Sequence, residues 1–148
     1  LYRWVFMGLC PTGVAGDPGI EFHSGVEFDA YPHALAALGA DIAVAPLVDR
    51  PFNRCKSALK LMEYGALGLP VIASAITPYV VAPVLRAANH EQWLAALREL
   101  QDSQRRRLLG DALRSWVSDH HSLASESILS QWRKALRLPM AGDRSESV

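Results

Sequence analysis

Residues 41–74 read DIAVAPLVDRPFNRCKSALKLMEYGALGLPVIAS and hold two apolar runs separated by a segment with helical spacing. The runs at residues 42–46 and 70–74 are apolar at successive positions, which is typical of strands that are covered on both faces. Residues 56–67 have the spacing of a helix, and Gly68 follows it as a stop signal. The order strand, helix, strand predicts a parallel β-α-β unit.

The N-terminal part of the chain continues the same alternation. Residues 3–7 and 20–24 are short apolar runs of strand length, and residues 29–38 have helical spacing that ends at Gly39. Together with the β-α-β unit, they predict an α/β fold in which a mainly parallel sheet carries helices on both faces.

From Asn89 onward the chain has only helical spacing, which predicts a helical C-terminal tail. Asn89 and Gln92 form the pattern of a capping box, and Ser103 and Ser122 are candidate caps for two further helices. Three tryptophans fall at core-facing positions of these helices: Trp93, Trp116 and Trp132.

The composition is that of one ordinary globular domain. Apolar residues make up 50% and charged residues 20% of the 148 residues, enough for a core over residues 1–138. Residues 139–148 are polar and without periodicity, which predicts a disordered tail. The 15 basic and 15 acidic residues cancel, which argues against a general nucleic-acid binder and a polybasic membrane anchor. Binding of an anion must therefore rest on a local group of residues.

The cysteines and histidines give no support to a metal site or a disulfide scaffold. Cys10 and Cys55 lie far apart without a C-x-x-C pair, which favours a reducing, cytoplasmic setting. His120 and His121 are adjacent, so they point in different directions on a helix, and no acidic ligand set accompanies them. The sequence therefore predicts no metal site.

The polar loop at residues 48–55 follows the carboxyl end of a predicted strand, where open parallel sheets bind their ligands. The next helix is predicted to begin near Lys56 and Ser57, so its unpaired N–H groups and positive dipole end form a cradle for a diphosphate. At about 100° per residue, Lys56, Lys60 and Glu63 share one line along this helix. The lysines are candidates to neutralise the diphosphate, and the Glu63 carboxylate is a candidate to accept two hydrogen bonds from a ribose diol.

The strand, loop and helix just described resemble the donor-binding core of retaining glycosyltransferases of the GT-B fold, family four, particularly bacterial O-antigen and capsule enzymes. The resemblance rests on the strand DIAVAPL and on the run LKLMEYGALGLPVIAS, which is similar to the family's E-x7-E helix followed by A-x-G-x-P-V-I-A. Glu63 matches the second glutamate, which in the family binds the nucleotide ribose. The first glutamate falls at Cys55, so the chain departs from the pattern there. Asn53, Lys56 and Ser57 are the candidates to replace that glutamate at the donor.

The resemblance implies a Rossmann-like three-layer sandwich that binds a nucleotide-diphosphate sugar as donor substrate, without a metal or another cofactor. The implied reaction transfers a hexose, with retention, to a glycan or lipid-linked acceptor in polysaccharide biosynthesis, in the cytoplasm at the inner face of the membrane. Because the chain begins at Leu1 with a strand-like segment, we expect a piece of a longer protein that lacks the N-terminal acceptor-binding domain. Such a piece is expected to be inactive alone, since the reaction takes place between two domains. No catalytic residue is assigned.

Other interpretations stay open at this point. A non-catalytic Rossmann-like nucleotide-binding or interaction module is consistent with Cys55 at the first glutamate position. On spacing alone, Lys60 and Glu63 also fit a solvated surface pair that contributes a few tenths of a kcal/mol. A flavodoxin-like or receiver-like regulatory domain requires an acidic cluster at the first strand ends, and residues 3–8 supply none.

Overall fold

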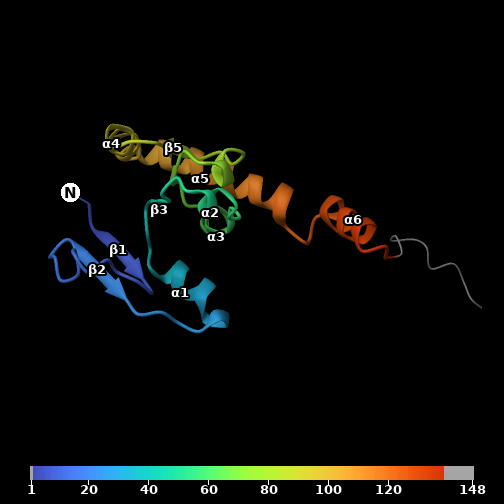
Figure 1. Ribbon diagram of the computed structural model, residues 1–148, viewed down its shortest axis with the longest axis horizontal. Helices are drawn as coiled ribbons and strands as arrows, with labels where there is room; N and C mark the ends of the chain where they lie inside the picture. The colour runs from blue at the N-terminus through green and yellow to red at the C-terminus, as the bar shows by residue number, and fades with distance from the viewer. Residues whose placement is uncertain (1, 139–148) are drawn as a thin grey trace, which may run out of the picture. The chain divides into compact units, whose positions relative to one another are not determined.

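The computed structural model describes residues 2–138, and its contacts divide the chain into two compact units, Leu1–Asp41 and Ile42–Val148 (Figure 1). The units are described separately below. The predicted disordered tail at residues 139–148 lies outside the described residues. The prediction of one domain over residues 1–138 stays a prediction.

The first unit contains a two-stranded parallel sheet and a short helix. Strands β1 (Trp4–Met7) and β2 (Ile20–His23) pair in the register Trp4 with Ile20 through Met7 with His23. A 3-10 turn, η1 (Phe28–Ala30), leads into helix α1 (Tyr31–Ala37). Both strands and the helix were predicted to within about two residues. None of the described residues 2–41 is buried.

The second unit is built on a three-stranded parallel sheet in the order β3-β4-β5. The strands are β3 (Ala43–Ala45), β4 (Val71–Ser74) and β5 (Leu85–Ala87). The central strand β4 is buried at all four positions, as its unbroken apolar run predicts. The sequence did not predict β5, because three residues with Arg86 in the middle carry no strand signal of their own.

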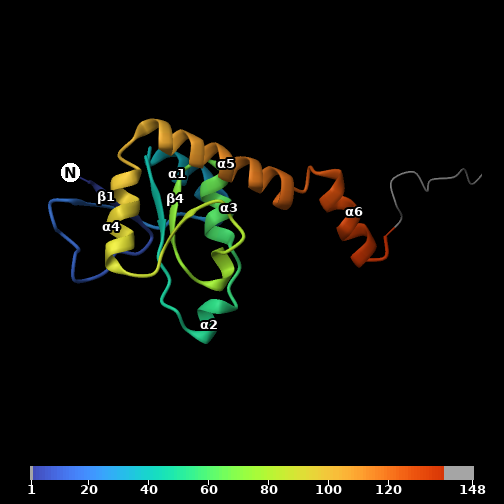
Figure 2. The same ribbon diagram turned by 90° about the horizontal axis from the view of Figure 1, so that it is seen from above.

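Apolar clusters cover both faces of this sheet. Successive side chains of a strand point to opposite faces. Val71 and Ala73 accordingly pack with Leu61 of helix α3 (Leu59–Ala66) and with Leu113 of helix α5 (Ser103–His121). Ile72 packs on the opposite side with Ala96 and Leu100, at helix α4 (His90–Glu99). Figure 2 shows β4 between α3 and α4. Helices on both faces of a parallel sheet, as predicted, are therefore present in this unit.

The helix starts agree with the sequence in one case and correct it in two. Asn89 caps α4 by accepting a hydrogen bond from the Gln92 N–H at 3.0 Å, as predicted. Helix α5 is capped by Asp102 instead of Ser103, because the Asp102 carboxylate accepts from two backbone N–H groups and a charged acceptor is stronger. Ser122 does not cap helix α6 (Glu126–Ala135). Its hydroxyl accepts from the Ala124 N–H in a turn, and α6 begins after Ser125.

The three tryptophans of the C-terminal helices differ in their surroundings. Trp93 and Trp116 are partly buried against the two clusters, as predicted. The prediction of a core position for Trp132 is wrong, since this residue on α6 is 55% exposed and no residue of α6 is buried. Among residues 2–138, no helix combines the length and the apolar character needed to cross a bilayer.

The predicted helix at residues 56–67 is interrupted at its start. Pro51 opens a short helix, α2 (Pro51–Arg54), and the chain then turns before α3 begins at Leu59. The turn closes through hydrogen bonds from the Cys55 N–H to the Phe52 carbonyl and from the Lys56 N–H to the Asn53 carbonyl, each 3.3 Å long. Proline fits the first helical position, because its fixed φ suits a helix start. The helix start near Lys56 and Ser57 is therefore corrected to Leu59.

Candidate functional site

Two cavities of similar size lie at the carboxyl ends of the β3-β4-β5 strands. The first, about 460 Å³, is called here the lysine pocket, and the second, about 470 Å³, the tryptophan pocket. Both lie within the size range of small-molecule sites in proteins. Both are lined by Pro46 and Leu47, which follow β3 directly. The position agrees with the rule that open parallel sheets bind ligands at the carboxyl ends of their strands.

The lysine pocket contains three of the residues that the sequence predicted for the site: Lys56, Ser57 and Lys60. Its other walls are Val44, Ala45, Pro46, Leu47, Leu59, Tyr64 and Tyr79. The amino end of α3 thus opens onto the carboxyl end of β3, as the site hypothesis requires. The backbone N–H groups of Ser57 and Leu59 have no acceptor among residues 2–138. Two ammonium groups and two N–H donors make this an environment for an anion.

Glu63 lies one helical turn beyond the pocket. Its Oε2 accepts a hydrogen bond from the Lys60 Nζ at 2.9 Å, and the Glu63 side chain is 21% exposed. The pair predicted from spacing therefore forms, but Glu63 is more buried than a solvated surface pair requires. Glu63 does not itself line the pocket and reaches its edge through Lys60. The ribose-binding role of Glu63 stays a prediction.

The structure does not bring Asn53 to either pocket. The Asn53 Nδ2 donates to the Val48 carbonyl at 2.8 Å and so closes the loop that leads into α2. Cys55, at the position of the family's first glutamate, is exposed and also lies outside both pockets. Asn53 is therefore a structural residue of the loop rather than a lining residue, and Lys56 and Ser57 are left as candidates to contact the donor.

Two tyrosines of the lysine pocket were missed by the sequence analysis. Tyr79 is buried, with 3% exposure, and follows β4 in the 3-10 turn η2 (Thr77–Tyr79). Burial raises the pKa of its phenol, and the Lys60 ammonium opposes that shift, so the hydroxyl stays protonated and can donate. The sequence does contain one indication of Tyr79, because it follows the buried strand β4 closely and loops at the carboxyl ends of parallel strands bind ligands.

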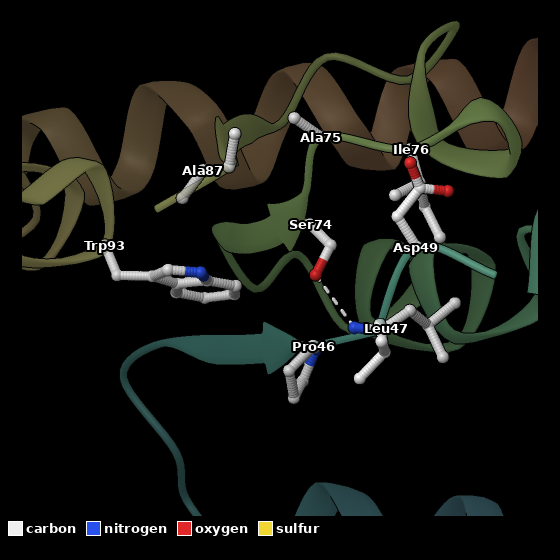
Figure 3. Close-up of a pocket in the computed structure, with 10 residues that line it drawn as sticks. Pro46, Leu47, Asp49, Ser74, Ala75, Ile76, Ala87 and Trp93 are labelled. Atoms are coloured by element: carbon white, nitrogen blue, oxygen red, sulfur yellow. Dashed lines mark hydrogen bonds between the residues drawn. The ribbon is translucent and has the colours of Figure 1, made fainter. Parts of the chain in front are cut away.

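The tryptophan pocket was also missed. It lies on the face of the sheet that α4 covers, and Figure 3 shows the Trp93 indole, the Ser74 hydroxyl and the Asp49 carboxylate around it. The Ser74 Oγ accepts from the Leu47 N–H at 2.8 Å and thereby joins the ends of β3 and β4. Asp49, Ser74 and Trp93 are separated by about 25 and 19 residues in the sequence, so no local motif predicts that they lie together.

Asp49 is held by a two-point ion pair at the rim of the tryptophan pocket. The Arg54 Nε lies 2.6 Å from the Asp49 Oδ1, and the Arg54 Nη2 lies 2.9 Å from Oδ2. The hydrogen bond from Arg54 lowers the pKa of the Asp49 carboxyl below its usual 3.8. Asp49 is therefore an ionised acceptor across the neutral range.

We expect Arg54→Gln to raise the pKa of Asp49 toward 3.8, as measured by a carbon NMR titration of the carboxyl group. Because the folded-state pKa is the lower one, this ion pair contributes to stability above about pH 4 and its contribution is lost as the pH falls through the folded pKa. Arg50→Gln is the control, because the ion pair of Asp49 is made by Arg54 and not by Arg50. An Asp49 titration that Arg54→Gln leaves unchanged contradicts the assignment.

No three side chains of His, Cys, Asp and Glu gather closely enough within residues 2–138 to hold a metal ion. The lysine pocket suits a ligand with negative charge, and the tryptophan pocket suits a neutral one. Comparison of the chain with protein-family models, with curated proteins and with solved structures found no match.

Proposed function

We propose that the chain is the donor-binding domain of a glycosyltransferase of the GT-B type, which binds a nucleotide-diphosphate sugar. The observation that carries the proposal is the lysine pocket, where Lys56 and Lys60 stand at the amino end of α3 and face the carboxyl end of β3. In the proposal, the diphosphate lies against these lysines and the Ser57 N–H, and Glu63 receives the ribose hydroxyls.

The charges around the pocket support an anionic ligand. The Lys56 Nζ lies 5.2 Å from the centre of the Phe52 ring, which holds the ammonium by a cation–π contact without neutralising it. Lys60 is paired with Glu63, and the positive end of the α3 dipole adds to the field of both lysines. The positive charge of Lys56 and of the α3 dipole is therefore better compensated by an anionic ligand than by a neutral one.

The Rossmann-like three-layer sandwich is part of the proposal. Its support is that all strand pairs are parallel, that α3 connects β3 to β4, and that helices lie on both faces of the β3-β4-β5 sheet. Folds of this kind place their ligands where both pockets lie, at the carboxyl edge.

The proposed reaction transfers a hexose to a glycan or lipid-linked acceptor when the chain acts with an acceptor-binding domain, in the cytoplasm at the inner face of the membrane. The lysines and the α3 N–H groups then stabilise the negative charge that develops on the diphosphate leaving group. The chain alone is expected to bind the donor without transferring the sugar.

The second candidate is a non-catalytic nucleotide-binding or interaction module. It is favoured by Cys55, which stands at the first glutamate position and is exposed outside both pockets. Thermal shifts with UDP, GDP, ADP and CMP test nucleotide binding directly, because a ligand that binds only the folded state raises the melting temperature. Saturable stabilisation by one of the diphosphates favours the donor-binding domain over an interaction module, and stabilisation by none of the nucleotides contradicts the donor-binding domain.

The role of Glu63 has its own test. We expect Glu63→Ala to weaken binding of the stabilising nucleoside diphosphate by about 1.5–3 kcal/mol, the loss typical of hydrogen bonds to a charged group. Isothermal titration calorimetry measures the effect, and a 2′,3′-dideoxy nucleotide should bind the variant and the unchanged protein equally.

The matched control for this test is Glu99→Ala, which removes a carboxylate from another ion pair, Glu99 with Arg105 at 2.6 Å, remote from the lysine pocket. It should leave nucleotide affinity unchanged. Equal affinity of Glu63→Ala and the unchanged protein for the full ribonucleotide would refute the ribose contact.

A further inference from the structure

The tryptophan pocket differs from the lysine pocket in its charge. Among the described residues that line it, none is a lysine, an arginine or a histidine, and its one charged group is the Asp49 carboxylate. A phosphate there would lie beside the Asp49 carboxylate, and no cationic side chain in the lining would bind it. The pocket is therefore suited to a neutral group.

Ser74 supplies a buried hydrogen-bond donor to this pocket. The residue is 8% exposed, and its Oγ already accepts from the Leu47 N–H. A hydroxyl has one hydrogen to donate in addition to its lone pairs. No acceptor for the Ser74 hydrogen is present within residues 2–138, so the hydroxyl is available to an oxygen in the pocket.

Asp49 supplies acceptors at the rim of the same pocket. Arg54 takes one lone pair of each carboxylate oxygen and keeps the group ionised. A carboxylate has about four acceptor positions, so each oxygen keeps one for a ligand. The Asp49 side chain is 54% exposed, which leaves these positions open to an arriving hydroxyl.

Trp93 supplies a flat apolar wall. It lies in the first turn of α4 and packs with Ile72 and Ala87 in the cluster on that face of the sheet. Figure 3 shows its indole directed toward the space beside Ser74 and Pro46. A pyranose ring has the complementary chemistry, since its axial C–H groups pack on an aromatic plane while its hydroxyls at the edge both donate and accept.

We propose that the tryptophan pocket is a hexopyranose subsite, in which the sugar ring lies on Trp93 and its hydroxyls bond to the Asp49 carboxylate and the Ser74 hydroxyl. The inference rests on the proposed function and deepens it, because it assigns the carbohydrate a place of its own. The two pockets share Pro46 and Leu47, so the sugar of a bound nucleotide sugar is one source of the ring. A hexose of a glycan acceptor is the other source.

Calorimetry on the 148-residue chain tests the proposal by comparing UDP with UDP-glucose, GDP with GDP-mannose, and free maltose. We expect either the hexose of a nucleotide sugar to improve affinity about 3- to 10-fold or maltose to bind by itself. The first result identifies the donor sugar as the source, and the second identifies a glycan. In either case Trp93→Leu should abolish the gain in affinity that the hexose provides, or the binding of maltose, while the affinity for the free diphosphate stays unchanged.

Matched variants separate a binding role of Trp93 from a packing role. Trp93→Phe keeps an aromatic plane and should retain most of the affinity for the sugar. Trp132→Leu removes an exposed tryptophan from α6 and should retain all of that affinity. Asp49→Asn, on the exposed loop, should weaken the affinity for the sugar without disturbing the core. The indole N–H signal of Trp93 in the NMR spectrum of the unchanged protein should also shift on addition of the sugar.

The outcomes distinguish this inference from the proposed function. If UDP or GDP binds but neither a nucleotide-linked hexose nor maltose shows a Trp93-dependent effect, the subsite is refuted and the diphosphate site stands. If maltose binds through Trp93 while no diphosphate binds, the subsite stands and the donor-binding function fails. Absence of binding in every arm overturns both.

Discussion

Replacing Leu113 with alanine is expected to lower the free energy of unfolding of the Ile42–Val148 unit by about 2–5 kcal/mol. Leu113 of α5 is 0% exposed and packs in the same cluster as Leu61 and Val71, beneath the sheet that carries both pockets. The variant loses the transfer free energy of the removed methyl groups and also leaves a cavity that the surrounding strands and helices fill only in part.

The matched control for Leu113→Ala lies on the same helix. Leu108 is 57% exposed, so Leu108→Ala should change the free energy of unfolding by less than about 1 kcal/mol. Urea denaturation followed by circular dichroism measures the free energy of unfolding of the two variants. The comparison is valid if both variants have the m-value of the unchanged protein. Equal losses in the two variants would show that Leu113 is not a core residue.

Gly110→Val is expected to destabilise the same unit by about 3 kcal/mol or more. A Cβ atom at Gly110 would overlap the carbonyl group of Gly68, which is a backbone contact that no side-chain rotation can relieve. The Gly68 backbone is itself constrained, since it has a φ of 70° and the preceding Leu67 carbonyl accepts from the Arg114 Nη2 at 3.0 Å. Helix α5 can approach the end of α3 only because position 110 has no side chain.

Ala112→Val is the control for this substitution, because it introduces the same β-branched residue at an exposed position of α5. It should cost only the difference in helix propensity, about 0.5 kcal/mol. Gly110→Ala tests whether the free energy of unfolding rises or falls. Alanine is the better helix former and stabilises an unobstructed helix by about 1 kcal/mol, but here its Cβ meets the Gly68 carbonyl. An increase in stability with Gly110→Ala would contradict the close approach.

Local patterns predicted most of the secondary structure. Unbroken apolar runs placed β3 and β4, and the pair Asn89 and Gln92 placed the start of α4. The same patterns failed where two candidate caps are adjacent in the sequence. Asp102 and Ser103 are both good caps, and only the folded chain shows which of them meets the N–H groups of α5.

The candidate site divides in the same way. Lys56, Ser57 and Lys60 lie within five residues of one another beside a predicted strand end, so spacing alone could gather them, and the structure places all three in the lysine pocket. Asn53 has a similar place in the sequence, but its amide closes the loop instead. The position of a residue in the sequence indicates roughly where its backbone lies. It does not determine the hydrogen-bond partner of a polar side chain such as the Asn53 amide.

The sequence alone determined the positions of strands β1 to β4, the helical segments between the later strands, and the clustering of Lys56 and Lys60 after β3, because each depends on residues that are near neighbours in the chain. The tryptophan pocket, strand β5 and the contact between Gly110 and Gly68 arose only on folding. Each of these brings together groups that are separated by about a dozen or more residues, and their contact depends on how the strands and helices pack rather than on any period in the sequence.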